Sequence, residues 1–144
     1  MNRQSLELLL NNFLEMDSKK ISSIMLKVSD VPFLDINDSR LTLKEKITKS
    51  KRTFYPVCSG NKENIIGIIH IKELLVGALS ESKIDLTEGL HEPMYFNEDS
   101  SIHQVYDIFF QSKIGAAFIV DKENNVTGFV TLKEVTNTFL AILS

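Results

Sequence analysis

Thr131 and Glu134 are two residues of this chain whose types and spacing suit ligand chemistry. They lie three residues apart at the predicted start of a helix, on one side of its first turn. The free N–H groups and positive dipole end of a helix N-terminus suit a phosphate, and Lys133 adds positive charge nearby. A carboxylate only accepts hydrogen bonds, so Glu134 suits a diol, which donates twice. The alternative is a capping box, in which both side chains bind the helix's own backbone.

The segment that carries these residues has a counterpart in the first half of the chain. Gly67–Glu73 recurs as Gly128–Glu134 at an offset of 61 residues (128 − 67). The repeat predicts two copies of a unit too small to bury a good core alone, with a natural ligand site in the groove between them. In the first copy His70 replaces the threonine. His70 suits either a phosphate donor or, as is more common for a histidine at a strand end, a half-buried structural role.

Composition and charge exclude several classes of protein. The chain has 43% hydrophobic and 24% charged residues, as an ordinary globular protein does. Its aliphatic runs are too short to span a bilayer, and no signal peptide is visible. The net charge of −3 with mixed signs makes nucleic acid a poor partner. The single cysteine, Cys58, suits a reducing compartment, so we expect a cytoplasmic location.

Enzyme chemistry has no motif in this sequence. His70, His91 and His103 have no metal-ligand spacing with each other or with Cys58. A nucleophile elbow, a phosphate loop and a dinucleotide fingerprint are all missing from the sequence. We therefore expect a protein that is not an enzyme, with no catalytic residue, no metal site and no fixed cofactor.

Hydrophobic periodicity predicts the elements that position these residues. An amphipathic helix is predicted over 3–15, with its apolar stripe at Leu6, Leu9, Leu10, Phe13 and Leu14. A short helical piece follows over 20–26. The first copy then has a strand at 32–36, a helix at 42–50, strands at 54–59 and 65–70 around a polar turn, and a helix at 71–79. A capping box is expected at Thr42 and Glu45.

The second copy repeats this order. It has a strand at 94–96, a helix at 101–111 with a capping box at Ser101 and Gln104, strands at 116–120 and 126–130, and a helix at 132–143. The hairpin strands are apolar at nearly every position, so both faces of each hairpin should be covered.

This β-α-β-β-α order, with Gly-hydrophobic-hydrophobic-Thr-x-x-acid before the last helix, resembles the cystathionine-β-synthase (CBS) domain over about residues 22–140. Finer features are similar to the CBS pair of the magnesium/cobalt-efflux and hemolysin-like transporter family: Ile24-Met25, Asp30-Val31, Tyr55-Pro56-Val57, and the segments 66–75 and 126–135. The resemblance implies an α/β (α+β) fold of two repeats packed as a pseudo-two-fold pair. The implied divisions are an N-terminal helical segment 1–21, repeat 22–80, connection 81–92 and repeat 93–144.

The resemblance also implies roles for individual residues. In similar domains the threonine reaches phosphate and the acid takes the ribose hydroxyls, so Thr131 and Glu134 with Gly128 and Lys133 are expected near the ligand. The acid of nucleotide-binding repeats is usually Asp, whereas both repeats of this chain have Glu. The implied site of the first repeat has His70 and Glu73. An apolar adenine pocket, with core packing as the alternative for each residue, is implied at Val31, Pro32, Tyr55, Pro56, Met94, Tyr95, Ala116 and Ala117.

Two functions follow from the resemblance. The first is a regulatory module that senses AMP, ADP or ATP between its repeats and is linked to magnesium/cobalt transport or to a hemolysin-like protein, whose membrane domain would lie outside this chain. The alternative is a structural dimerisation module with a degenerate nucleotide site. A homodimer is expected in either case, because two apolar stripes offer more hydrophobic surface than a small module covers. These are the stripe of the N-terminal helix and the one at Leu132, Val135, Phe139, Leu140 and Leu143.

Overall fold

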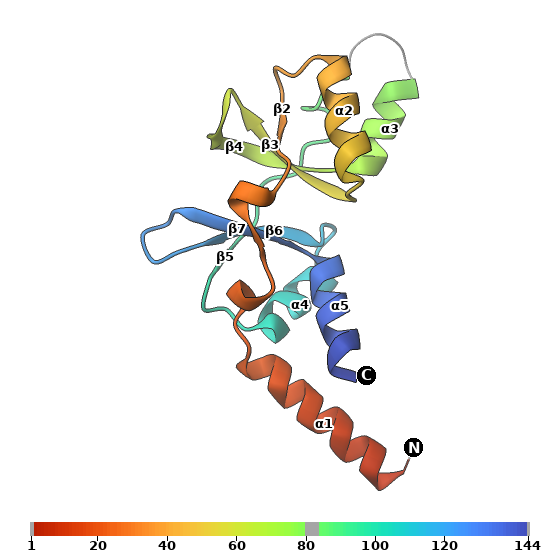
Figure 1. Cartoon of the computed structure of the whole chain (residues 1–144), viewed down its shortest axis with the longest axis vertical. Helices are drawn as coiled ribbons and strands as arrows, with labels where there is room; N and C mark the ends of the chain where they lie inside the picture. Colours follow the sequence, from red (N-terminus) through yellow and green to blue (C-terminus); the bar gives the residue numbers. More distant parts are fainter. Residues whose placement is uncertain (1, 80–83, 144) are drawn as a thin grey trace. The chain divides into compact units, whose positions relative to one another are not determined.

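A computed structural model describes residues 2–79 and 84–143 of the chain. The fold divides into two compact units (Figure 1). The terminal unit joins Met1–Ser29 to Met94–Ser144, and the central unit is Asp30–Pro93. The predicted mixed α/β class is confirmed, since each unit combines a sheet with helices. Among the described residues, no helix has the length and apolar character needed to cross a membrane.

The terminal unit contains a four-stranded sheet in the order β1-β7-β6-β5. Its strands are β1 (Leu26–Lys27), β5 (Tyr95–Asn97), β6 (Ala116–Val120) and β7 (Val126–Thr131). The hairpin β6–β7 is antiparallel, with Ala116 opposite Thr131 and Ile119 opposite Gly128. β5 runs parallel to β6, and β1 closes the other edge antiparallel to β7. Strands from both ends of the chain therefore meet in one sheet.

Three helices belong to this unit, and all three contact one another: α1 (Arg3–Ser18), α4 (Ile102–Gln111) and α5 (Leu132–Leu143). The predicted capping box of α4 is confirmed: Ser101 and Gln104 bind each other's backbone N–H. The core joins α4, α5 and the sheet to the short 3-10 helix η1 (Ile21–Ser23). Its buried members are Ile21, Ile102, Val105, Phe109, Ala117, Ile119, Val130 and Val135.

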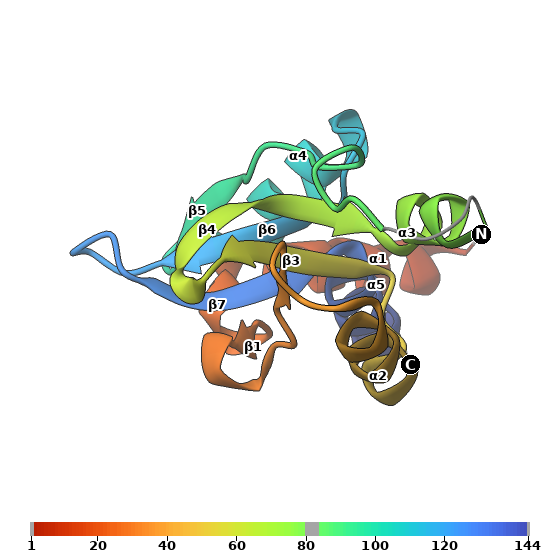
Figure 2. The same cartoon turned by 90° about the horizontal axis from the view of Figure 1, so that it is seen from above.

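The central unit contains a three-stranded sheet in the order β2-β3-β4. Its strands are β2 (Leu34–Asp35), β3 (Phe54–Ser59) and β4 (Asn61–His70), and the antiparallel pair β3–β4 is seen side by side in Figure 2. A second 3-10 helix, η2 (Val28–Asp30), precedes β2. Helices α2 (Arg40–Ser50) and α3 (Ile71–Leu79) complete the unit. The core comprises Leu34, Leu43, Tyr55, Val57, Ile69, Leu74 and Leu86.

The repeated glycines Gly67 and Gly128 are sites of close chain approach. A Cβ added to Gly128 would lie 2.3 Å from Sδ of Met25 and 2.9 Å from the carbonyl oxygen of Leu26. A Cβ added to Gly67 would lie 1.9 Å from Cδ2 of Leu90 and 2.5 Å from the carbonyl oxygen of His91. Each hairpin is thus crossed by a segment that precedes a repeat in the sequence, and the missing side chain makes the room.

Some predicted elements were wrong in detail. The helical piece at 20–26 is instead η1 followed by β1, because residues 26–27 pair with β7. The predicted capping box at Thr42 and Glu45 is also wrong. α2 begins earlier, at Arg40, because the hydroxyl of Ser39 accepts the N–H of Thr42 at 3.1 Å.

The predicted apolar stripes are divided between core and solvent. On α1, Leu6, Leu10 and Leu14 are exposed, whereas Asn12 is buried. On α5, Val135 is buried and Leu140 is exposed. The side chains of Phe13 and Leu143, like residues 80–83 of the predicted connection, lie outside the described part of the chain. The exposed leucines of α1 lie at i, i+4 and i+8, so they form one ridge.

Candidate functional site

The junction between β7 and α5 positions the leading candidate residues. Thr131 ends β7 and Leu132 begins α5, so the chain turns directly from strand to helix. The N–H of Leu132 donates to the carbonyl oxygen of Gly115 at 2.7 Å, which ties the start of α5 to the chain just before β6. This bond fixes where the first turn of α5 lies relative to the hairpin.

Thr131 and Glu134 touch each other at this junction. Thr131 is buried, with 4% of its surface exposed, and its hydroxyl donates a short hydrogen bond to a carboxylate oxygen of Glu134. The backbone carbonyl of Glu134 in turn accepts the hydroxyl of Thr138 at 2.9 Å. Glu134 is half-buried and Lys133 is exposed. A carboxylate in the first turn also interacts favourably with the helix dipole.

This arrangement has two chemical capacities. The start of α5 combines N–H groups without intrahelical partners, a lysine and a hydroxyl, which together suit a bound anion. Without a ligand, however, the Thr131 hydroxyl already donates to Glu134. A hydroxyl has one proton to donate, so an incoming phosphate has to compete with the carboxylate for it.

The other predicted residues of the terminal unit surround the hairpin. Gly128 lies on β7 against Met25 and Leu26. Met94 is half-buried, packs against the core, and its carbonyl oxygen accepts the N–H of Phe118 at 2.8 Å. Ala117 is fully buried in the core. The ligand roles proposed for these residues stay predictions.

His70 is built into the central unit. It ends β4 as Thr131 ends β7, and the N–H of Ile71 donates to the carbonyl oxygen of Thr53 at 2.7 Å. Nδ1 of His70 accepts the N–H of Lys72 at 2.9 Å, which caps α3, so the proton of the neutral ring lies on Nε2. The ring also packs edge-on against Phe54, with centroids 4.8 Å apart. Glu73, on the first turn of α3, is exposed, and its stem lies against Gly89.

The remaining candidates of the central unit are buried. Val31, Tyr55 and Pro56 all lie in its interior. The hydroxyl of Tyr55 lies 2.7 Å from that of Ser50 and accepts the N–H of Arg52 at 3.0 Å. Tyr55 therefore holds the end of α2 against β3, and its role at an adenine ring stays a prediction.

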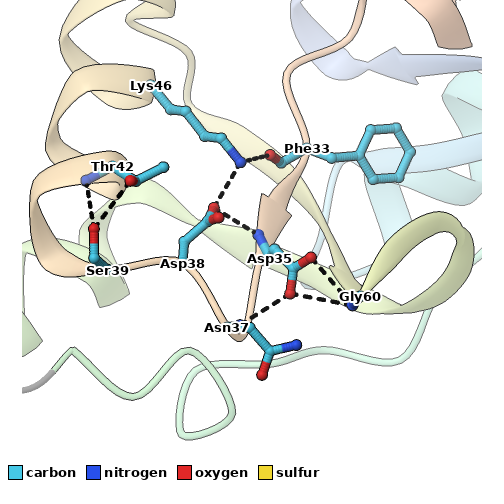
Figure 3. A network of polar contacts seen from close by, with 8 residues as sticks. All are labelled: Phe33, Asp35, Asn37, Asp38, Ser39, Thr42, Lys46 and Gly60. Carbon is cyan, nitrogen blue, oxygen red and sulfur yellow. Dashed lines mark hydrogen bonds and ion pairs between the residues drawn. The ribbon is translucent and has the colours of Figure 1, made fainter.

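A polar network around β2 was missed by the sequence reasoning (Figure 3). The carboxylate of Asp35 accepts the N–H groups of Asn37 at 2.9 Å and Gly60 at 3.1 Å. The carboxylate of Asp38 binds Nζ of Lys46 at 2.6 Å, and the same ammonium donates to the carbonyl oxygen of Phe33 at 2.9 Å. The available signal was the cluster of Asp, Asn and Ser before a helix, since these side chains bind nearby backbone in turns.

These contacts change the acidity of several groups. The backbone N–H groups of Asn37 and Gly60 hold the pKa of Asp35 below its usual value. The backbone N–H groups of Asn125 and Glu123 likewise lower the pKa of Asp121, in the turn between β6 and β7. Burial, followed by the charge of Asp35, raises the pKa of the Cys58 thiol. Cys58 therefore stays protonated near neutral pH and behaves as a small hydrophobic residue.

Two hollows in the central unit lie away from the predicted site residues. One, of about 300 Å³, lies between α2 and α3 and is lined by Ile47, Leu74 and Leu75 with Arg40 and Lys44 at its polar side. The other, of about 740 Å³, lies at the start of α2 around Asn37–Arg40 and Asp85. Within residues 2–79 and 84–143, His, Cys, Asp and Glu side chains form no group of three or more that could hold a metal ion.

Comparison with known proteins identifies the repeated unit. The sequence profile of the CBS domain matches residues 21–79 and again residues 88–141. The CBS domain of a Clostridium difficile 630 protein is 29% identical and superposes with a TM-score of 0.81, covering 88% of this chain and 98% of that one. The CBS domain of a bacterial CNNM/CorC family Mg²⁺ transporter, solved in complex with ATP, is 19% identical with a TM-score of 0.81, covering 93% and 96% of the two chains.

Curated relatives are longer than this chain. A UPF0053 protein in the cps region of Klebsiella pneumoniae is 26% identical over 132 residues, which are 91% of this chain and 41% of the relative. The chain spans between 25% and 41% of the first three relatives it matches. The two profile matches together cover well over half of the chain. The chain therefore belongs to the CBS domain family and carries two copies of the domain.

Proposed function

We propose that this chain is a regulatory module that binds an adenine nucleotide, AMP, ADP or ATP, with Thr131 near phosphate and Glu134 near the ribose hydroxyls. The observation that carries the proposal is the start of α5, where a buried hydroxyl, a lysine and a carboxylate are gathered at a helix N-terminus. The ATP bound to a CBS domain of the same fold supports a nucleotide as the ligand class.

The regulated partner is proposed from the relatives. They include a Hemolysin C of Brachyspira hyodysenteriae and a polyamine export protein of Escherichia coli. We infer that the module acts on the cytoplasmic side of a transporter for magnesium, cobalt or another cation, or of a hemolysin-like protein. Nucleotide occupancy would then change the activity of the membrane domain.

Calorimetric titration of the purified chain with AMP, ADP and ATP, with and without magnesium, tests the proposal. We expect binding with a Kd between about 1 μM and 1 mM. Lys133→Ala should weaken ATP binding about tenfold, because a charged phosphate contact is lost. Lys122→Ala is the matched control, since Lys122 is exposed in the turn at the opposite end of the β6–β7 hairpin. No heat at millimolar nucleotide would exclude the proposed function.

A dimerisation module without nucleotide is the second candidate. It is favoured by the exposed leucine ridge of α1 and by the engagement of His70 as a helix cap. We propose that the chain forms a homodimer under either function. Light scattering should report twice the chain mass at micromolar concentration, and Leu10→Glu on the ridge should halve it. A monomer at high micromolar concentration would exclude the homodimer.

A further inference from the structure

We propose that the contact between the Thr131 hydroxyl and the Glu134 carboxylate is a self-inhibiting contact that lowers the affinity of this site for phosphate. The inference rests on the proposed function and adds a regulatory element to it. In the ligand-free chain the buried hydroxyl donates to Glu134, so it is not available to another acceptor. A phosphate that approaches Thr131 has to displace this carboxylate.

The length of the Glu134 side chain explains why the contact forms. Residues 131 and 134 lie at the N-cap and third positions of α5, where glutamate is the acid that reaches back to a threonine. Aspartate is one methylene shorter and reaches less well. Glu134 therefore acts as a specificity-determining residue: it occupies the donor and places a negative charge where the phosphate would bind.

Burial makes the competition stronger than it would be on an open surface. Thr131 is 4% exposed and Glu134 is half-buried, so water replaces little of a broken contact. A hydrogen bond to a charged group corresponds to about a tenfold or larger change in affinity. The equivalent position of the central unit is also engaged internally, since His70 caps α3. Each repeat thus binds its own backbone or side chains at the point where a phosphate would enter.

Pyrophosphate is the decisive probe, because it lacks the ribose that Glu134 is proposed to hold. Three variants separate the effects: Glu134→Asp keeps the charge and shortens the reach, Glu134→Gln keeps an acceptor and removes the charge, and Thr131→Val removes the hydroxyl. Glu134→Asp should bind pyrophosphate about tenfold more tightly than the wild type. Adding Thr131→Val should abolish that gain, whereas Thr131→Val alone should change the wild-type affinity less than twofold.

Other causes give different patterns. If charge repulsion alone limits binding, Glu134→Gln gains affinity for pyrophosphate and Glu134→Asp does not, which would overturn the inference. If side-chain length matters only for the ribose, Glu134→Asp gains affinity for adenosine and not for pyrophosphate, which would overturn it as well.

A measurement without ligand checks the contact itself. Thr131→Val and Glu134→Ala should each lower the urea midpoint of unfolding, and the double variant should lower it by less than the sum of the two. Additive shifts would overturn the inference. Nucleotide binding by the wild type together with no gain in Glu134→Asp rejects the inference and leaves the proposed function standing. No binding of pyrophosphate or nucleotide by any variant rejects both, whereas binding by Glu134→Asp alone supports the inference and rejects nucleotide sensing by the native chain.

Discussion

Tyr55 shows how a side chain can have the right type for a ligand and still serve the fold. Its ring is fully buried, and its hydroxyl is shared between Ser50 and the N–H of Arg52. We expect Tyr55→Phe to lower the free energy of unfolding by about 1 to 3 kcal/mol, because it leaves a backbone N–H without its acceptor. Chemical denaturation provides the measurement.

Tyr106→Phe is the matched control for this prediction. Tyr106 is 37% exposed on α4, so losing its hydroxyl should change stability by less than about 0.5 kcal/mol. Equal effects of the two substitutions would contradict the role assigned to the Tyr55 hydroxyl.

Asp35 predicts how stability depends on pH. Its folded pKa is lowered by the N–H groups of Asn37 and Gly60, so its contribution is fully present above its unfolded pKa of about 3.9. The contribution is lost as the pH falls through the lower, folded value. Asp35→Asn should therefore destabilise the protein at pH 7 and reduce the loss of stability on acidification below pH 4.

Urea midpoints measured from pH 7 down to pH 2.5 would check this prediction. Part of the acid dependence should survive in Asp35→Asn, because the pKa of Asp121 is lowered in the same direction. An unchanged acid slope in Asp35→Asn would show that Asp35 contributes nothing.

At the scale of elements, the sequence predicted the hairpins and the helices after them closely. The strands 116–120 and 54–59 and the helices 71–79 and 132–143 have the predicted bounds. Long apolar runs with a turn between them determine such elements locally. The start of α2 was misplaced because Ser39 and Thr42 are both suitable caps three residues apart, and the choice between them depends on geometry.

Short strands with distant partners could not be predicted. β1 has two residues, and only its pairing with β7 makes it a strand. The residue types of the candidate site were visible in the sequence, but the contact between Thr131 and Glu134 and the cap by His70 were not. Both depend on which of several acceptors a side chain faces, and sequence spacing alone does not decide that.

The close approach at Gly128 yields a prediction for the β1–β7 pair. Gly128→Ala should destabilise the protein by about 1 to 3 kcal/mol, because the new Cβ overlaps Met25 and the carbonyl of Leu26. In a Met25→Ala background the same substitution should cost less, since the sulfur is gone and the carbonyl alone remains. Thermal unfolding of the four proteins measures this coupling, and an equal cost in both backgrounds would contradict the contact.

At the scale of the whole molecule, sequence repeats and structural units differ. The terminal unit takes Met1–Ser29 together with Met94–Ser144, and Ile21 of its core comes from the first segment. A chain of residues 94–144 alone should therefore not fold. Joining residues 1–29 to 94–144 by a glycine–serine linker of about 20 residues, which spans about 25 Å, should restore cooperative unfolding.

Circular dichroism during heating would distinguish the two chains. We expect a sharp transition for the joined chain and none for residues 94–144. A cooperative transition of residues 94–144 alone would show that β1 and η1 are dispensable, which contradicts the described core.

The pairing of β1 with β7 also fixes an order of events during translation. Leu26 meets Phe129 across 103 residues of sequence (129 − 26), whereas Ile68 and His91 of the central unit are 23 apart (91 − 68). The ribosome completes the central unit 38 residues (131 − 93) before it finishes β7, which corresponds to about 2 to 8 seconds of synthesis. Throughout that interval the nascent residues 21–27 wait without their partner strand. The central unit can form first, and closure of the long loop makes the terminal unit the slower to assemble.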